Sequence, residues 1–187
     1  MRFIDKTLFL RGVMLWCLLS LPSTFFAPSL EFLAGLLGTM LFVISVKNVE
    51  QKIPELMRLK NKLKFMMCVI IGIAIIDFTQ NIIPIGIIPA IVELAEPAIG
   101  LYVLRLAIEM VSVEAGAHNS TLQINKLQKV WLIGAVVMAV ICCAYLLSVF
   151  VKSFNLIVLT LLIGKLVFVL IKIMLFIFFY KELESKK

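Results

Sequence analysis

Five ionisable side chains lie inside long apolar stretches of this sequence, where a charge is energetically costly. They are Asp77, Arg105, Glu109, Lys165 and Lys172. An ionisable residue within a membrane-spanning segment usually faces protein or water, and it often marks the path of a ligand, an ion or a proton. These five residues are therefore the candidates for ligand binding or ion coupling.

The spacing of these residues predicts how they meet. Arg105 and Glu109 are four residues apart, so a helix brings them within reach of an ion pair. Lys165 and Lys172 are seven apart and share one helix face. Counting about 1.5 Å per residue from the inner end of each span, Asp77 lies at a depth of ~18 Å, between Lys172 at ~12 Å and Lys165 at ~22 Å. We therefore expect Asp77 to contact both lysines, next to the Arg105–Glu109 pair.

Three interpretations of this charge cluster remain open. The charges can form buried ion pairs that fix helix packing, with Lys172 and Arg105 extending toward the interface. Their excess positive charge can instead attract an anionic or carboxylate-bearing ligand into a polar cavity. In the third interpretation, Asp77 or Glu109 carries protons or couples to a cation.

The composition points to a membrane protein. Of 187 residues, 63% are hydrophobic and 16% are charged, and the mean hydropathy is +1.12. Soluble domains are about 45–50% apolar and about 25% charged. A water-soluble fold of this size cannot bury so much apolar surface. The composition thus excludes a soluble globular protein, a disordered chain and a nucleic-acid-binding domain, despite a net charge of +7.

Six apolar segments are long enough to cross a bilayer core of ~30 Å, which needs about 20 helical residues. They are residues 7–26, 28–46, 65–83, 90–113, 130–151 and 154–180. Short connections join them into three hairpins, so we expect an all-α, polytopic bundle that forms a single integral membrane domain, 1–187. The middle turn, between Pro84 and Pro89, is apolar enough to re-enter the bilayer. Ala34 and Gly38, four residues apart, predict a close helix contact.

The basic residues predict the orientation of the bundle. Of 18 lysines and arginines, Arg105, Lys165 and Lys172 lie deep inside predicted spans and Lys152 lies in a predicted outer loop; the other fourteen, including Arg11 near the start of the first span, lie on the inner side. This bias places both termini in the cytoplasm. The first span is expected to be retained, because no small-residue cleavage site follows it. The pattern suits the cytoplasmic membrane of a bacterium.

The longest inner segment, residues 47–64, is both basic and amphipathic. Leu56, Leu59 and Leu63 recur at helical spacing. The basic residues among them are Arg58, Lys60, Lys62 and Lys64. One interpretation is a short cytoplasmic helix that binds anionic lipid or a partner protein. The simpler one is an ordinary loop that obeys the inward bias of positive charge.

Residues that build catalytic and metal sites are sparse. His118 is the only histidine, and with Glu114 it falls short of the three or four ligands that a metal needs. The four cysteines lie in apolar stretches and form no CxxC motif: Cys17, Cys68, Cys142 and Cys143. The sequence contains no glycine-rich phosphate loop and no nucleophile elbow. We expect no cofactor, no metal and no enzymatic activity.

The leading hypothesis is a small transport protein, or the membrane subunit of a transporter. It would bind a small solute in a polar cavity between the third, fourth and sixth spans, driven by a gradient or by a partner ATPase. The alternative is a non-transporting interaction protein, such as an immunity, sensor or regulatory subunit. A third option is an intramembrane enzyme. Expected partners are the bilayer, another membrane protein or a second copy, and not nucleic acid.

Overall fold

The structure is a computed structural model of the chain, and it describes residues 3–19, 28–46, 53–80, 88–117, 124–151 and 154–184. The helices are α1 (Lys6–Met14), the π-helical turn η1 (Leu15–Leu19), α3 (Pro28–Ser45), α4 (Pro54–Gln80), α5 (Ile88–Ala117), α6 (Ile124–Phe150) and α7 (Phe154–Glu184). Within these ranges the only sheet-like contact is an isolated bridge between Ile4 and Val46. The predicted all-α fold is confirmed. The apolar middle turn falls outside the described residues except for Ile88 and Pro89, which begin α5.

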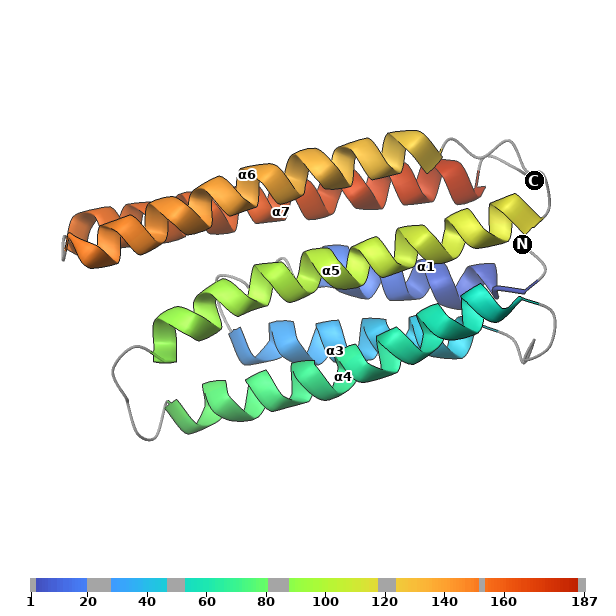
Figure 1. Ribbon diagram of the computed structural model, residues 1–187, viewed down its shortest axis with the longest axis horizontal. Coiled ribbons are helices and arrows are strands. Elements are labelled where there is room, and N and C mark those ends of the chain that lie inside the picture. The colour runs from blue at the N-terminus through green and yellow to red at the C-terminus, as the bar shows by residue number, and fades with distance from the viewer. Residues whose placement is uncertain are drawn as a thin grey trace.

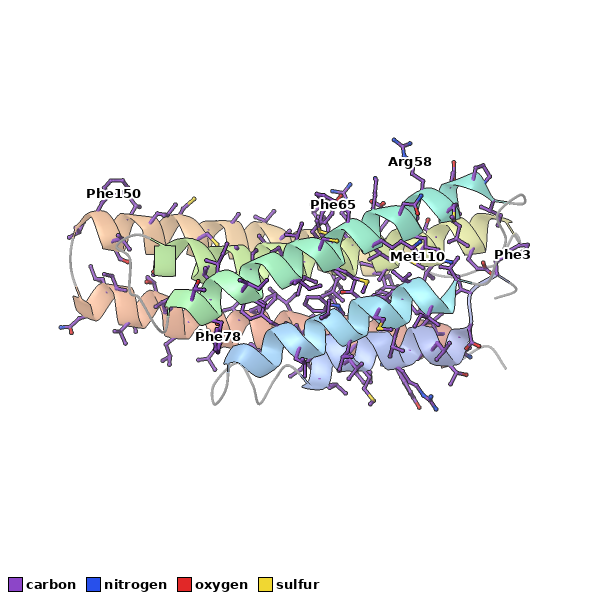
Figure 2. All side chains as sticks on the ribbon, turned by 90° about the horizontal axis from the view of Figure 1, so that it is seen from below. Phe3, Arg58, Phe65, Phe78, Met110 and Phe150 are labelled. Atoms are coloured by element: carbon purple, nitrogen blue, oxygen red, sulfur yellow. The ribbon has the colours of Figure 1, made fainter. Side chains whose placement is uncertain are left out.

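Successive helices run in opposite directions along one long axis (Figure 1). The N-terminal ends of α4 and α6 lie at the same end of the bundle as the C-terminal ends of α5 and α7. The start of α1 and the end of α3 lie there too. We call this the terminal end. At the opposite end, α6 and α7 extend beyond the other helices as a projecting hairpin (Figures 1 and 2).

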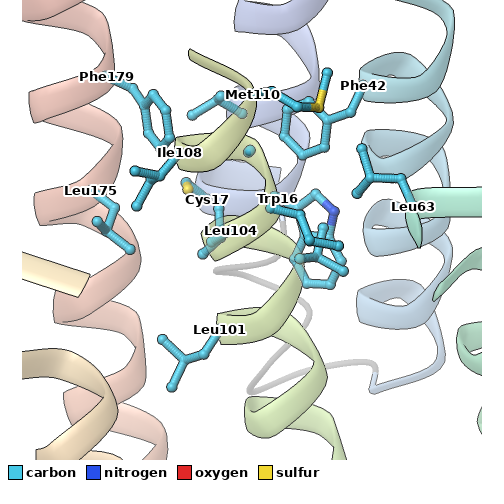
Figure 3. Close-up of a cluster of buried hydrophobic side chains, with 14 of the residues drawn as sticks. Trp16, Cys17, Phe42, Leu63, Leu101, Leu104, Ile108, Met110, Leu175 and Phe179 are labelled. Carbon is cyan, nitrogen blue, oxygen red and sulfur yellow. The ribbon is translucent and has the colours of Figure 1, made fainter. Parts of the chain in front are cut away.

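The core surrounds α5, which is buried on nearly every side. Among its buried residues are Leu101, Val103, Leu104, Leu106, Ala107, Ile108, Met110 and Val111. Figure 3 shows side chains of η1, α3, α4 and α7 converging on this helix. Phe9 links three helices, because its ring lies 5.0 Å from that of Phe42 and 5.9 Å from that of Phe179, centroid to centroid. An apolar helix with a single polar stripe is typical of the centre of a bundle.

Glycines allow α1 and α3 to pack backbone against backbone. A Cβ atom at Gly12 would lie 3.0 Å from the Gly38 carbonyl oxygen. A Cβ at Gly38 would lie 2.6 Å from Cδ1 of Trp16. The Trp16 indole N–H donates to Thr39 Oγ1 at 3.0 Å, within the core. The close contact predicted at Gly38 is therefore present, and Trp16 fills the space beside it.

Hydrogen bonds to Ser45 and Glu114 hold the N-terminal segment against the terminal end, and a cap begins α1 there. The Asp5 carboxylate caps α1 by accepting hydrogen bonds from the backbone N–H groups of Thr7 and Leu8, at 3.0 and 3.1 Å. The Asp5 N–H donates to the Ser45 carbonyl at 2.7 Å, which ties the start of α1 to the end of α3. In addition, Oε1 of the buried Glu114 accepts a hydrogen bond from the Phe3 N–H at 3.0 Å.

The amphipathic stretch at residues 54–64 is continuous with the following apolar segment in α4. It is therefore the first part of a 27-residue helix and not a separate short helix. Its three leucines, Leu56, Leu59 and Leu63, are buried in the core of the protein. The leucines are thus unavailable for insertion into a bilayer, contrary to the expectation of a helix lying on the lipid surface. Their own protein partners, rather than lipid, hold this stretch in place.

Two of the described helical stretches, Ile124–Phe150 and Asn155–Lys181, are long and apolar enough to cross a membrane. Phe32–Ser45 is apolar but shorter. α5 is long but carries several ionisable residues, among them Arg105, Glu109 and Glu114. Large apolar side chains are exposed on α3, α4, α6 and α7; Figure 2 shows Phe65, Phe78 and Phe150 among them.

Candidate functional site

Arg105 and Glu109 lie on the one exposed stripe of α5. Tyr102 and Arg105 are exposed and Glu109 is partly exposed, whereas most of their neighbours on the helix are buried. Arg105 Nε donates to Glu109 Oε1 at 2.9 Å, and the two side chains are 52% and 35% exposed. The ion pair expected from the i, i+4 spacing is present. It lies at the surface of the central helix rather than in the interior.

Trp131 of α6 faces this ion pair from the neighbouring helix. Arg105 Cζ lies 5.2 Å from the centroid of the Trp131 ring, which is a cation–π distance. The Trp131 indole N–H donates to the Leu101 carbonyl oxygen at 2.7 Å. This hydrogen bond fixes the ring across the gap between α5 and α6, so the indole and the guanidinium hold each other in place.

A pocket of about 400 Å³ opens beside the ion pair, between α5 and α6. Its lining residues are Arg105, Ile108, Glu109, Gln128, Trp131 and Leu132. The volume falls within the range of about 300–1,000 Å³ that small-molecule sites occupy. The pocket combines a guanidinium, a carboxylate and an amide with apolar walls. Such a set of groups can recognise a charged ligand by hydrogen bonds.

The pocket lies toward the terminal end of the bundle. Gln128 and Trp131 belong to the first two turns of α6, which begins at Ile124. Lys126 and Lys129, in the same turns, are exposed. The pocket thus lies close in sequence to exposed lysines, and its own lining includes the apolar Ile108 and Leu132.

The structure separates Asp77 from the lysines that were expected to contact it. Asp77 is partly buried near the end of α4, and Lys165 and Lys172 lie on α7. α4 packs against α3 and α5, whereas α7 packs against α6, α1 and η1. Figure 1 shows α4 and α7 at opposite edges of the bundle. Of the five charged residues, Arg105 and Glu109 form an ion pair.

Lys172 has the most enclosed position of the five. Its relative exposure is 0%, and its Nζ lies 4.1 Å from the centroid of the Phe168 ring, one turn earlier in α7. Phe168 in turn packs on Gly100 of α5, where an added Cβ would lie 2.9 Å from Phe168 Cζ. The ammonium is thus held by an aromatic face within the core and does not extend toward the interface.

Arg58, Lys62 and Lys64 form an exposed basic face at the start of α4. Figure 2 shows Arg58 directed away from the bundle. Lys60 is partly buried, and its Nζ donates to the Val46 carbonyl at 3.4 Å. Three of the four predicted surface cations are therefore exposed, and the fourth contacts the end of the preceding segment.

In the described part of the chain, no group of three or more His, Cys, Asp or Glu side chains is placed to hold a metal ion. The cysteines are free thiols there: Cys17 is buried, Cys142 is partly buried, and Cys68 and Cys143 are exposed. His118 lies outside the described residues.

Two pocket residues, Gln128 and Trp131, were missed as site candidates in the sequence. In the sequence, Trp131 has the position of an aromatic anchor at a membrane interface. Gln128 lies between the basic residues Lys126 and Lys129. An antiparallel pairing of α5 with α6 would have indicated both residues, because it places the first two turns of α6 opposite Arg105.

Comparison of this chain with known protein families, with curated proteins and with solved structures finds no match.

Proposed function

We propose that this chain is a polytopic protein of the bacterial cytoplasmic membrane, with six spans in three hairpins and both termini in the cytoplasm. The exposed apolar side chains of α3, α4, α6 and α7 support this proposal, because a soluble protein rarely exposes such large apolar faces. The exposed cations of α4 and α6 lie in the turns nearest the terminal end. This distribution is typical of the cytoplasmic side of a membrane.

The orientation is tested by labelling single cysteines in cells. The four native cysteines are replaced by alanine, and Ser153→Cys or Lys187→Cys is introduced. A membrane-impermeant maleimide is expected to label Ser153→Cys in intact cells and Lys187→Cys only after permeabilisation. The reverse pattern would invert α7, and labelling of both in intact cells would show that α7 does not cross the membrane.

Within that membrane, we propose that the protein binds a small charged ligand in the pocket between α5 and α6, as a small transporter or as the membrane subunit of one. The observation that carries this proposal is the Arg105–Glu109 pair beside a pocket of about 400 Å³. This pocket replaces the cavity expected between the third, fourth and sixth spans. A gradient or a partner ATPase would drive transport.

Ligand binding is tested with purified protein in nanodiscs. The probes are glycine, glutamate, betaine, phosphoethanolamine and inorganic phosphate, and the readout is the unfolding midpoint. At least one probe is expected to raise the midpoint and to enter proteoliposomes. Because a hydrogen bond to a charged group contributes about 1.5–3 kcal/mol, Arg105→Gln is expected to weaken binding roughly tenfold or more. Lys64→Gln, which removes a cation from the basic face, serves as the matched control. Equal binding by both variants would exclude the pocket.

A second candidate function is that of a regulatory or immunity subunit that binds another membrane protein. The observation that favours it is the exposed face of Arg58, Lys62 and Lys64, which three buried leucines hold in a fixed position. This geometry suits an acidic partner surface. Changing all three to glutamine should abolish recovery of a stoichiometric partner from the native host, whereas Arg105→Gln should not. Unchanged recovery would exclude the basic face.

A further inference from the structure

The pocket between α5 and α6 places a guanidinium and a carboxylate next to apolar walls. We propose that it binds a zwitterionic aminophospholipid of the phosphatidylethanolamine type, in the leaflet at the terminal end. In this arrangement Arg105 contacts the phosphate diester and Glu109 contacts the primary ammonium. The inference rests on the proposed membrane topology and on the proposed pocket, and it names the chemical class of the ligand.

The depth of the pocket matches the headgroup region. Gln128 and Trp131 lie four and seven residues after the start of α6, which corresponds to roughly 6 and 10 Å along the helix axis. Lys126 and Lys129 are exposed, and both precede Trp131 in the first two turns of α6. Lysines followed by a tryptophan are typical of the boundary between headgroups and acyl chains. A ligand in this pocket therefore has its polar part at the level of the phospholipid headgroups.

The charges of the pocket favour a ligand with no net charge. Arg105 uses Nε to contact one carboxylate oxygen of Glu109, at 2.9 Å. Among the described residues, the terminal Nη groups of Arg105 form no other hydrogen bond, so they remain available to a phosphate. The carboxylate of Glu109 repels an anionic headgroup but accepts hydrogen bonds from an ammonium. An ion pair of opposite charges thus complements a zwitterion better than an anion.

The position of Trp131 distinguishes between two kinds of ammonium. A quaternary ammonium is recognised mainly by aromatic faces, because it has no N–H to donate. The face of Trp131 already contacts the Arg105 guanidinium at 5.2 Å. A primary ammonium, in contrast, donates hydrogen bonds directly to a carboxylate such as that of Glu109. The pocket should therefore prefer ethanolamine to choline headgroups.

The apolar surroundings provide a path for the acyl chains. Ile108 and Leu132 form the apolar lining of the pocket. From Leu132 the exposed side chains Ile133, Val136 and Val140 continue along α6 toward the other end of the bundle. A pocket of about 400 Å³ accommodates a headgroup and its glycerol but not two acyl chains. The chains would therefore lie outside the pocket, along this apolar face of α6.

The test compares lipids on the unaltered protein by native mass spectrometry. The protein is exchanged into nanodiscs that contain phosphatidylethanolamine, its N-methylated derivatives, phosphatidylcholine and phosphatidylglycerol in equal amounts. Retained lipid should fall several-fold from the primary to the quaternary ammonium, and the anionic lipid should be retained least. Equal retention of all headgroups, or preferential retention of the anionic lipid, would overturn the proposal. Because no substitution is involved, this series gives a result even where a variant fails to fold.

A variant then locates the site. Glu109→Gln keeps an oxygen acceptor for Arg105 but removes the charge that attracts the ammonium, so phosphatidylethanolamine retention should fall roughly tenfold. Lys64→Gln, the control on α4, should leave retention unchanged. Equal loss in both variants would show that the lipid binds elsewhere and would overturn the proposal.

The water-soluble probes separate the two proposals. If Arg105→Gln abolishes binding of a soluble probe and the lipid series shows no headgroup preference, the pocket binds a solute and only the lipid assignment fails. If neither the soluble probes nor the lipid series depends on Arg105 and Glu109, both proposals fail.

Discussion

The helices α1, α3 and α5 and the hairpin of α6 and α7 bury their apolar side chains in different ways. In the first group glycines allow backbones to touch, rings interlock, and α5 is enclosed almost completely. In the hairpin, α6 and α7 pack mainly on each other, and their outer faces carry exposed leucine, isoleucine and valine. The core is therefore specified by contacts within the protein. The hairpin requires an apolar surrounding to cover its outer faces.

The largest difference between the two regions should appear when the same aromatic side chain is deleted from each. Phe42→Ala removes a fully buried ring that packs on Phe9, and it should lower the free energy of unfolding by about 3–5 kcal/mol. Phe150→Ala, at the tip of the hairpin, removes a ring that is 83% exposed and should cost little. Unfolding in mixed micelles by increasing SDS measures both. A comparable loss for Phe150→Ala would mean that another protein surface covers the hairpin.

Glycine-to-alanine substitutions should give an intermediate difference. Gly38→Ala places a Cβ 2.6 Å from Trp16 Cδ1, so a destabilisation of about 1–3 kcal/mol is expected. Gly72→Ala on α4 is the matched control, because its Cβ would meet nothing within 4 Å. It should stabilise the helix by ~0.5–1 kcal/mol. On the hairpin, the atom nearest to a Cβ at Gly134 would be Cγ2 of Ile171, at 2.9 Å, which is less close than Trp16 is at Gly38, so the cost should lie between these two values. The SDS midpoints give this order, and a Gly38→Ala midpoint equal to the Gly72→Ala midpoint would contradict close packing.

The smallest effect on stability should come from the Arg105–Glu109 ion pair of α5, beside the hairpin. The Arg105 side chain is 52% exposed, so Arg105→Gln should change the free energy of unfolding by less than about 1 kcal/mol. The same substitution is expected to weaken ligand binding strongly. Measuring SDS midpoints beside probe binding separates these two consequences. A loss of stability as large as that of Phe42→Ala would make the pair a structural element of the core.

Local features of the fold were predictable, whereas contacts between distant helices were not. Hydropathy predicts where the helices lie, and the i, i+4 spacing predicts the Arg105–Glu109 pair. The expected meeting of Asp77 with Lys165 and Lys172 did not follow. Residues at equal depth meet only if their helices are neighbours and the residues face each other. The spacing of residues along the chain does not determine that α4 and α7 are separated.

The basic segment before the third apolar stretch shows the same limit. Its leucine periodicity predicts a helix with one apolar face, and Leu56, Leu59 and Leu63 do share a buried face. The pattern does not indicate whether lipid or protein covers that face. In this structure protein covers it, because α4 continues without a break into the bundle. An amphipathic pattern thus predicts which side is covered but not by what.

The chain contains two tryptophans, and the structure places one in each region. Trp16 of η1 is buried against α3 and α5, while the ring of Trp131 lines the pocket beside Arg105. The protein therefore carries two intrinsic fluorophores in separate environments. In a Trp16→Phe variant, all tryptophan emission comes from the pocket, and brominated acyl chains in the adjacent leaflet become a direct quenching probe of what lies beside it.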